Sequence, residues 1–272
     1  MIYDLHNDFL TGLPRERHRD YLIRGLKQSV KHIVPAIWTT EIKNIKDGFF
    51  RNSTSHIDDS DFGGLIDGYA IEDLHFLDSC SLGILSEIPL KYVGLTWNFD
   101  NALAGGALGN DGLKPLGRQV LVKAENLGIT VDTAHLNRKS FFDVAQYHRG
   151  RIMNSHCAFY AKHAHPRNLT DEQIQTVKDR GGIIGLALHE AFLSDKDVTL
   201  SDAVEHIDYF VQKFGCDNLC IGTDFNGCTP PHDLSDYCDF RILKVRLAKL
   251  GYGESDINSI FYKNAMDFFA QT

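Results

Sequence analysis

A chain of 272 residues with 43% hydrophobic composition can bury a large core, which excludes a disordered protein. The formal net charge is -8 and the sequence has no block of basic residues, so the expected partner is a small molecule rather than nucleic acid or an anionic membrane. No apolar run approaches the roughly 20 residues that span a bilayer, and acidic residues stand where a signal peptide would be apolar, which predicts a cytoplasmic protein.

Short runs rich in β-branched and aromatic residues alternate with amphipathic helical stretches along the chain. This rhythm is typical of repeated βα units that build a parallel sheet. The predicted strands cover residues 2–6, 32–38, 67–72, 91–97, 128–135, 151–156, 181–188 and 218–224. Pro35 argues against a central position for the second strand, because proline has no N–H to donate to a neighbour.

Helix boundaries in the second half of the chain carry clear signals. Thr170, followed three residues later by Gln173, predicts an N-cap with a capping box for a helix that ends at Gly181. Further helices are predicted over residues 201–214 and 254–269, and the last should pack on the outside of the strands because its apolar residues recur every three to four positions. No repeat or linker marks a boundary, which predicts one domain over residues 1–272.

Metal-binding and acid–base residue types are concentrated where the predicted strands end. In chain order these positions are His6 and Asp8, Trp38, Glu72, Trp97 and Asn98, His135, His156, His189 and Asp224. In a (β/α)8 barrel all strand ends meet at one face, whereas a doubly wound open sheet would not bring the first and last strands together. We therefore predict an α/β fold, a single (β/α)8 TIM barrel with a metal site at the C-terminal ends of its strands.

The combination of residue types predicts the chemistry of this site. Three imidazoles with several carboxylates are too many for one tetrahedral zinc and suit two divalent ions bridged by a carboxylate, either Glu72 or Asp224. Two adjacent ions hold hydroxide at neutral pH and polarise a carbonyl, while an unligated carboxylate moves the proton. The predicted reaction is hydrolysis.

Longer motifs surround these residues. They read LHND, AIED, LGITVDTAHLNRKSFFDV, NSHCAFYAKHAHPRNLTDEQ and IGTDFNG, and extend from about residue 2 to residue 230. These motifs resemble those of the membrane (renal) dipeptidase family of zinc peptidases, peptidase family M19 of the amidohydrolase superfamily. The resemblance implies an amidohydrolase-like barrel, hydrolysis of dipeptides by a metal-bridging hydroxide, and in some members a D-residue at the C-terminal position. It also implies homodimers, which are common in the family.

The resemblance implies which residues bind each of two zinc ions. His6, Asp8 and Glu72 would hold the first ion. His135 and His156 would hold the second, and Glu72 would bridge the two ions.

The resemblance also implies residues that act on the substrate. Asp224 would be the proton shuttle on the bridging water, and Arg167 would bind the C-terminal carboxylate of the dipeptide through its planar fork. Where family members read T-H-N or T-H-S, this chain reads Thr96, Trp97 and Asn98, so an indole N–H without charge replaces a histidine that steadies the carbonyl oxygen. We place Trp97 and Asn98 among the substrate-binding residues. The chain is also shorter than most members of the family, and the region of residues 27–62 is shorter than the corresponding region of those members.

Other interpretations of the same residues remain open. Hydrolysis of another amide, a lactone or an ester uses nearly the same metal pair, and a metal-binding protein without catalysis is an alternative that retention of Asp224 argues against. His189 is expected to be a rim histidine, and His163 and His165 are expected either to support the metal ligands from behind or to be structural. Asp132 alternates away from the strand end, so it is not expected to hold the second ring nitrogen of a metal-binding histidine.

Overall fold

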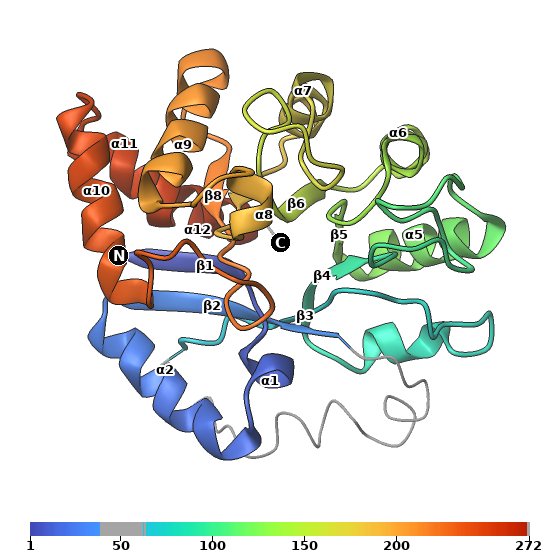
Figure 1. Ribbon diagram of the computed structural model, residues 1–272. Coiled ribbons are helices and arrows are strands. Elements are labelled where there is room, and N and C mark those ends of the chain that lie inside the picture. The colour runs from blue at the N-terminus through green and yellow to red at the C-terminus, as the bar shows by residue number, and fades with distance from the viewer. Residues whose placement is uncertain (39–61, 63, 271–272) are drawn as a thin grey trace.

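The computed structural model describes residues 1–38, 62 and 64–270. Within them, eight parallel strands follow one another in chain order and close into a barrel in which β1 pairs with both β2 and β8 (Figure 1). The strands are β1 (Ile2–Asn7), β2 (Val30–Ile37), β3 (Tyr69–Ile71), β4 (Leu90–Gly94), β5 (Thr130–Asp132), β6 (Ile152–Cys157), β7 (Ile184–Leu186) and β8 (Leu219–Ile221). The predicted (β/α)8 barrel is confirmed, and each predicted strand overlaps an observed one.

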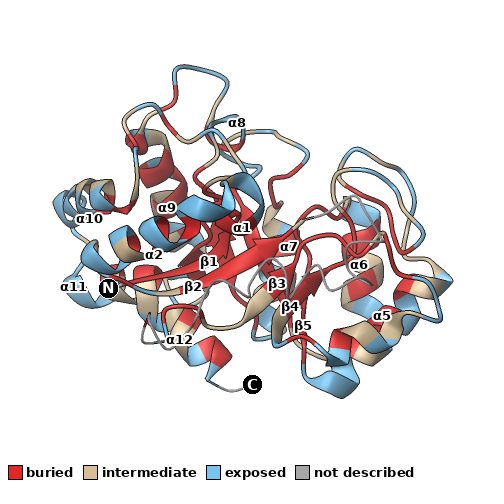
Figure 2. Ribbon diagram, turned by 90° about the horizontal axis from the view of Figure 1, so that it is seen from below, coloured by how far each residue is buried: buried red, intermediate tan, exposed pale blue. Residues whose placement is uncertain are grey.

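Helices surround the barrel on its outside (Figure 1). They are α1 (Phe9–Gly12), α2 (His18–Lys27), α5 (Pro115–Leu127), α6 (Arg138–Tyr147), α7 (Asp171–Asp179), α8 (Glu190–Leu193), α9 (Leu200–Phe214), α10 (Phe240–Lys249), α11 (Glu254–Asn258) and α12 (Asn264–Phe269). Short 3-10 turns occur at η1 (Arg15–Arg17), η3 (Leu82–Ser86) and η4 (Tyr237–Asp239), and η5 (Ser259–Lys263) is a π-helix. In Figure 2 most strand residues are buried, and the helices carry buried residues on one side and exposed residues on the other.

Two predictions about individual elements are corrected. Pro35 lies inside β2, a barrel strand with a neighbour on each side, so the argument against a central position is wrong. Pro35 is opposite Asn7, where the pairing of β1 with β2 shifts register, so the missing N–H falls at an irregularity of the ladder. The helix expected over residues 201–214 begins one residue earlier, at Leu200, with Thr199 as its N-cap. The capping box of Thr170 and Gln173 at the start of α7 is confirmed.

The C-terminal segment is helical over residues 254–269, as predicted, but its middle is a π-helix and it does not pack only on the outside of the strands. Ile257, Ile260 and Phe261 pack in the apolar layer between strands and helices, but Phe268 and Phe269 pack against side chains inside the barrel. The π-helix η5 separates the two halves, and its wider turn changes the direction in which the following side chains point. The Phe269 ring lies 5.8 Å from that of Tyr3, near the start of β1. Helix α12 therefore closes the end of the barrel where strands begin.

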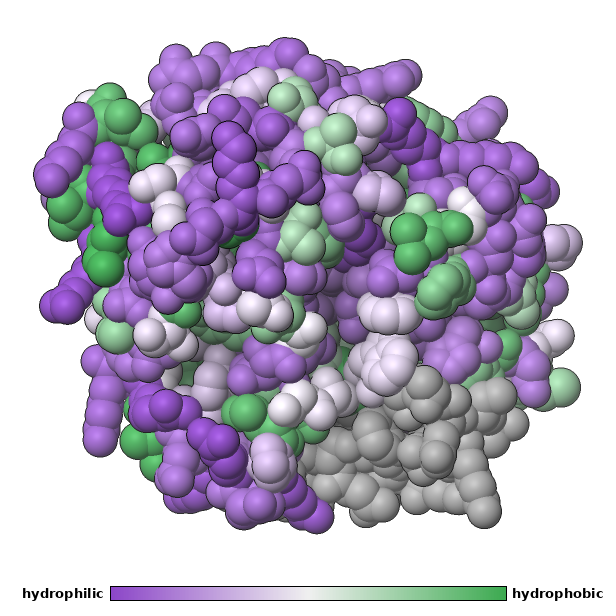
Figure 3. Space-filling view, in the orientation of Figure 1, coloured by the Kyte–Doolittle hydropathy of each residue, from purple (hydrophilic) through white to green (hydrophobic). Residues whose placement is uncertain are grey.

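The other end of the barrel, where the strands end, carries the polar side chains predicted from the sequence. Among the described residues, no helix combines the length and apolar character needed to cross a membrane. The surface in Figure 3 is largely hydrophilic, with hydrophobic residues in small separate groups. The predicted shortening of the region of residues 27–62 falls largely on residues 39–61, outside those described.

Candidate active site

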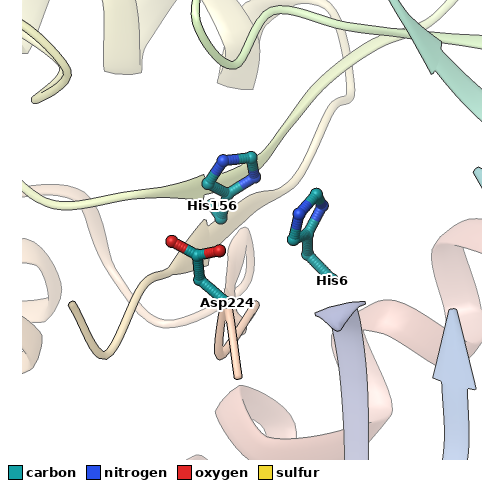
Figure 4. Close-up of side chains that lie close together, drawn as sticks. All are labelled: His6, His156 and Asp224. Atoms are coloured by element: carbon teal, nitrogen blue, oxygen red, sulfur yellow. The ribbon is translucent and has the colours of Figure 1, made fainter. Parts of the chain in front are cut away.

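The barrel brings together six of the predicted residues, although they come from distant parts of the chain. His6 lies on β1, His156 lies on β6 and Asp224 follows β8, and the three side chains lie close together (Figure 4). Asp8, Glu72 and His135 follow β1, β3 and β5. All six residues are buried, with 8% exposure at most.

These residues form three overlapping groups of metal-ligand type. The groups are His6, Asp8 and Glu72; Glu72, His135 and His156; and His6, His156 and Asp224; within each, the ligand atoms lie within 4.8 Å of one another. Glu72 belongs to the first two groups: its Oε1 is 2.7 Å from His135 Nε2, 3.6 Å from His156 Nε2 and 3.8 Å from His6 Nε2. His6 Nε2 is also 3.4 Å from Asp8 Oδ2. This geometry fits one or two divalent metal ions.

Hydrogen bonds at the far side of two imidazole rings determine which nitrogen faces the centre. The Tyr92 hydroxyl donates to the carbonyl oxygen of Leu5 at 2.9 Å, so its oxygen is free to accept from His6 Nδ1, also at 2.9 Å. Asn98 Oδ1 lies 2.9 Å from His135 Nδ1 and can only accept. Both rings therefore carry a proton on Nδ1 and direct Nε2 toward the carboxylates.

The third ring is held through an intermediate hydroxyl. His156 Nδ1 lies 2.8 Å from Ser155 Oγ, and Ser155 Oγ lies 2.5 Å from Asp132 Oδ2. As expected from its position, Asp132 makes no hydrogen bond to a histidine among the described residues. It reaches His156 indirectly, through the Ser155 hydroxyl, a link that the sequence did not reveal.

The cluster has a negative electrostatic potential, which is the property expected of a cation site. The Nε2 atoms of His135 and His156 face each other at 2.9 Å, and the buried His6 Nε2 has no hydrogen-bond partner in the described structure. Burial lowers the pKa of His6, but the carboxylates of Asp8, Glu72 and Asp224 outweigh this and raise it to about 10. The negative potential that favours a proton at His6 also favours a metal ion. The residues present therefore fit a bound divalent metal.

The neighbouring carboxyl groups of Asp8 and Asp224 have perturbed pKa values. Burial, followed by the negative charge of Asp8, raises the pKa of Asp224 well above its usual value, and burial raises that of Asp8. Gly227 lies beside both: a Cβ there would be 2.3 Å from Asp8 Oδ2 and 2.9 Å from Asp224 Oδ1. Only glycine leaves room for both carboxylates.

A cavity of about 460 Å³ opens onto the cluster, and Asp8, Glu72, His135 and Asp224 contribute to its lining. Arg167 also lines it; its side chain is buried, Nη2 lies 2.7 Å from His156 Nε2, and the guanidinium lies over the Phe192 ring. The predicted Trp97 and Asn98 line the same cavity. Asn98 also holds His135, so its observed contact is with a metal-ligand candidate.

Further residues of the cavity wall were not among the predicted substrate-binding residues. Trp38 packs 5.7 Å from Trp97, measured between ring centroids, so two indoles form one wall. His165 and His189 line the cavity, and their rings lie 5.0 and 4.5 Å from that of Phe192. Trp38 and His189 were already noted as strand-end residues in the sequence, but Phe192 follows β7 on α8 and has no comparable signal.

A closed parallel barrel with such a histidine and carboxylate cluster at its strand ends defines the class of protein: an amidohydrolase-like (β/α)8 barrel with a site for divalent metal. Residues 57–272 match the sequence model of the family described as "Membrane dipeptidase (Peptidase family M19)". The chain belongs to this family, which confirms the resemblance in the motifs.

The matches to individual relatives cover different shares of the length of each relative. An "uncharacterized protein in pqqA 5'region" of Klebsiella pneumoniae is 30% identical over 188 residues, 64% of this chain and 69% of that protein. "Dipeptidase aclJ" of Aspergillus oryzae is 26% identical over 206 residues, 72% of this chain, and the match spans about half of that protein, 49%. Among solved structures, a metallo peptidase from Rhodobacter sphaeroides, bound to a phosphinate mimic of the dipeptide L-Ala-D-Ala, superposes with a TM-score of 0.85. It is 19% identical, and the superposition covers 100% of this chain and 99% of that one, which shows the shared fold.

Proposed function

We propose that this protein is a binuclear zinc dipeptidase that hydrolyses the peptide bond of dipeptides. The observation that carries the proposal is the pair of ligand groups that share Glu72, with the Asp224 carboxylate close to His6 and His156 beside them. Membership of the M19 family supports it. The Rhodobacter sphaeroides relative, which binds a mimic of L-Ala-D-Ala, supports a dipeptide with a D-residue at the C-terminal position as a substrate to test.

In this proposal His6, Asp8 and Glu72 hold one zinc ion, and Glu72, His135 and His156 hold the other. When bound, the ions would polarise the peptide carbonyl and acidify the attacking water. A shared carboxylate keeps two ions close enough to act on one substrate group. The side chains of the protein supply the remaining steps.

Asp224 would move the proton. Its carboxyl group is buried beside Asp8, which raises its pKa, so it is suited to take a proton from the attacking water and to release it to the leaving amine. The main-chain N–H of Asp224 donates to the His6 carbonyl at 3.1 Å, which ties the shuttle to the β1 ligands. General acid–base groups of this kind contribute roughly 10²- to 10⁴-fold to rate.

Arg167 would bind the substrate's C-terminal carboxylate. Its guanidinium is buried in the cavity wall, and among the described residues its Nε has no hydrogen-bond partner and no carboxylate lies within ion-pair distance. A buried guanidinium without an anion favours binding of one, and its fork can bind a carboxylate with two hydrogen bonds. Trp97 can donate one indole hydrogen bond and offers, with Trp38, an apolar wall for a substrate side chain.

Hydrolysis of L,L and L,D dipeptides by the purified protein tests this function, with zinc content measured on the same sample. We expect turnover with about two zinc ions per chain, and a fall in kcat of roughly 10²- to 10⁴-fold in Asp224→Asn, because that variant loses the proton acceptor. Zinc content should stay unchanged in this variant.

Two bound ions without turnover of any dipeptide would contradict the dipeptidase proposal and move the substrate to another amide, a lactone or an ester. Trp97, in the place of the family histidine, would then be the first residue to exchange. One domain over residues 1–272, a cytoplasmic location and a homodimer stay predictions.

A further inference from the structure

Asp132, the last residue of β5, is a buried carboxylate that accepts hydrogen bonds from three donors. Its Oδ1 accepts the main-chain N–H groups of Ala134 at 3.0 Å and Ser155 at 2.9 Å. Its Oδ2 accepts the Ser155 hydroxyl at 2.5 Å. Burial raises the pKa of Asp132 and these three donors oppose the change; the carboxylate is the form that accepts from all three.

The direction of the next hydrogen bonds follows from the groups at both ends. Arg167 can only donate, so His156 Nε2, 2.7 Å from Arg167 Nη2, accepts. The neutral His156 ring then has its proton on Nδ1 and donates it to Ser155 Oγ at 2.8 Å. Ser155 in turn gives its own proton to Asp132. One consistent chain of donors runs from Arg167 through His156 and Ser155 to Asp132.

We propose that Asp132 is a positioning residue that sets the tautomer of His156 through Ser155, so that the Nε2 lone pair faces the metal site. This inference rests on the proposed metal-binding function, because it concerns a ligand of the second ion. A hydrogen bond from the other ring nitrogen fixes both the orientation and the tautomer of a metal-binding histidine. Here the Asp132 carboxylate acts indirectly: it fixes the direction of the Ser155 hydroxyl, and that hydroxyl accepts the hydrogen bond from His156 Nδ1.

The Asp132→Asn variant separates this role from simple packing. The two main-chain N–H groups at Oδ1 require an acceptor there, so an asparagine would place its oxygen at that position and its NH2 group toward Ser155. Ser155 Oγ would then accept from the amide, and its proton would turn to His156 Nδ1. The isosteric variant therefore favours the His156 tautomer with its proton on Nε2, where a metal ion would bind.

Zinc affinity, measured by competition with a chromophoric chelator, is the first readout. We expect zinc to bind the His135 and His156 site roughly 10- to 100-fold more weakly in Asp132→Asn than in the unaltered protein. Ser155→Ala removes the hydroxyl that joins Asp132 to His156 but does not favour the opposite tautomer. The zinc affinity of this variant should therefore fall less than that of Asp132→Asn. Thr130→Val is the matched control, because the Thr130 hydroxyl is buried on the same strand without a hydrogen-bond partner in the described structure. Its zinc affinity should not change.

Nitrogen-15 NMR of the histidine rings is the second readout, with the His156 signals assigned by their loss in His156→Gln. In zinc-free protein we expect the proton on Nδ1, and in Asp132→Asn on Nε2. Equal zinc affinity and the same tautomer in Asp132→Asn would overturn the inference and leave the proposed function intact. If the unaltered protein binds no zinc, the proposed function fails, and the tautomer comparison still decides the inference. Ser155→Ala supplies the affinity test if Asp132→Asn does not fold.

Discussion

His135 and Asp224 have left-handed backbone conformations, with φ of 65° and 61°. Residues with a Cβ rarely adopt this region, and surrounding structure must hold them there. Such strain is concentrated at functional sites, and these two residues are a proposed metal ligand and the proposed proton shuttle. The turn after β8 is held by Asp4, whose buried carboxylate accepts the main-chain N–H of Thr223 at 2.8 Å and its hydroxyl at 2.7 Å.

Arg167 provides a test at the residue scale. Arg167→Lys keeps the positive charge but loses the planar fork, so we expect KM for a dipeptide to rise roughly tenfold or more, with a smaller change in kcat. A dipeptide amide has no C-terminal carboxylate and is the control substrate, for which the variant should leave KM nearly unchanged. Steady-state kinetics on both substrates check this. An equal loss on both would mean that Arg167 does not bind the carboxylate.

At the scale of elements, local sequence signals predicted helix ends well and long-range packing poorly. The capping box of α7 depends only on Thr170 and Gln173, three residues apart. The packing of the C-terminal segment depends instead on Phe268 and Phe269 contacting the inside of the barrel, which no local pattern reveals. A three- to four-residue periodicity is compatible with packing on either surface.

Helix α9 carries a buried histidine that links it to the segment after β6 and to α8. His206 Nδ1 accepts the main-chain N–H of Phe159 at 3.2 Å, and Nε2 donates to the Leu193 carbonyl at 3.1 Å. Burial lowers the pKa of His206 to about 4. Because its folded pKa lies below the unfolded value of about 6.5, the unfolded chain binds the proton more tightly. This contribution to stability is present above pH 6.5 and is lost as the pH falls.

The expected effect of His206 on the free energy of unfolding is a loss of about 2 kcal/mol between pH 7 and pH 5. His206→Gln cannot take up this proton, so its free energy of unfolding should fall less over the same interval. Urea unfolding at both pH values checks this, with the exposed His232→Gln as control. The same pH dependence in His206→Gln and the unaltered protein would contradict the assignment.

At the scale of the whole molecule, barrel closure assembles the site. His6 and Asp224 are 218 positions apart in the chain, yet β1 pairs with β8 through Asp4 and Ile221, which places them side by side (Figure 4). The proposed ligands come from β1, β3, β5 and β6 or the residues that follow them. A bound metal would therefore tie several strand ends together, at the opposite end of the barrel from α12.

Zinc removal should destabilise the fold for this reason. A ligand that binds only the folded state at 1,000 times its Kd stabilises it by about 4 kcal/mol. We expect a strong chelator to lower Tm by several degrees, and re-addition of zinc to restore it, as measured by differential scanning calorimetry. His135→Gln, which lacks one proposed ligand, should respond less to the chelator. A response equal to that of the unaltered protein would argue against zinc binding at this site.

Alternation, capping and motif spacing are local patterns, so the sequence was enough to predict the barrel class, the strand positions and the residue types at the strand ends. It also pointed to His6, Asp8, Glu72, His135, His156 and Asp224, which the barrel brings together. How the histidine rings are held could not be predicted, because it depends on contacts between distant segments. Tyr92 is 86 positions from His6, and Asp132 is 23 positions from Ser155, so these hydrogen bonds exist only once the barrel closes.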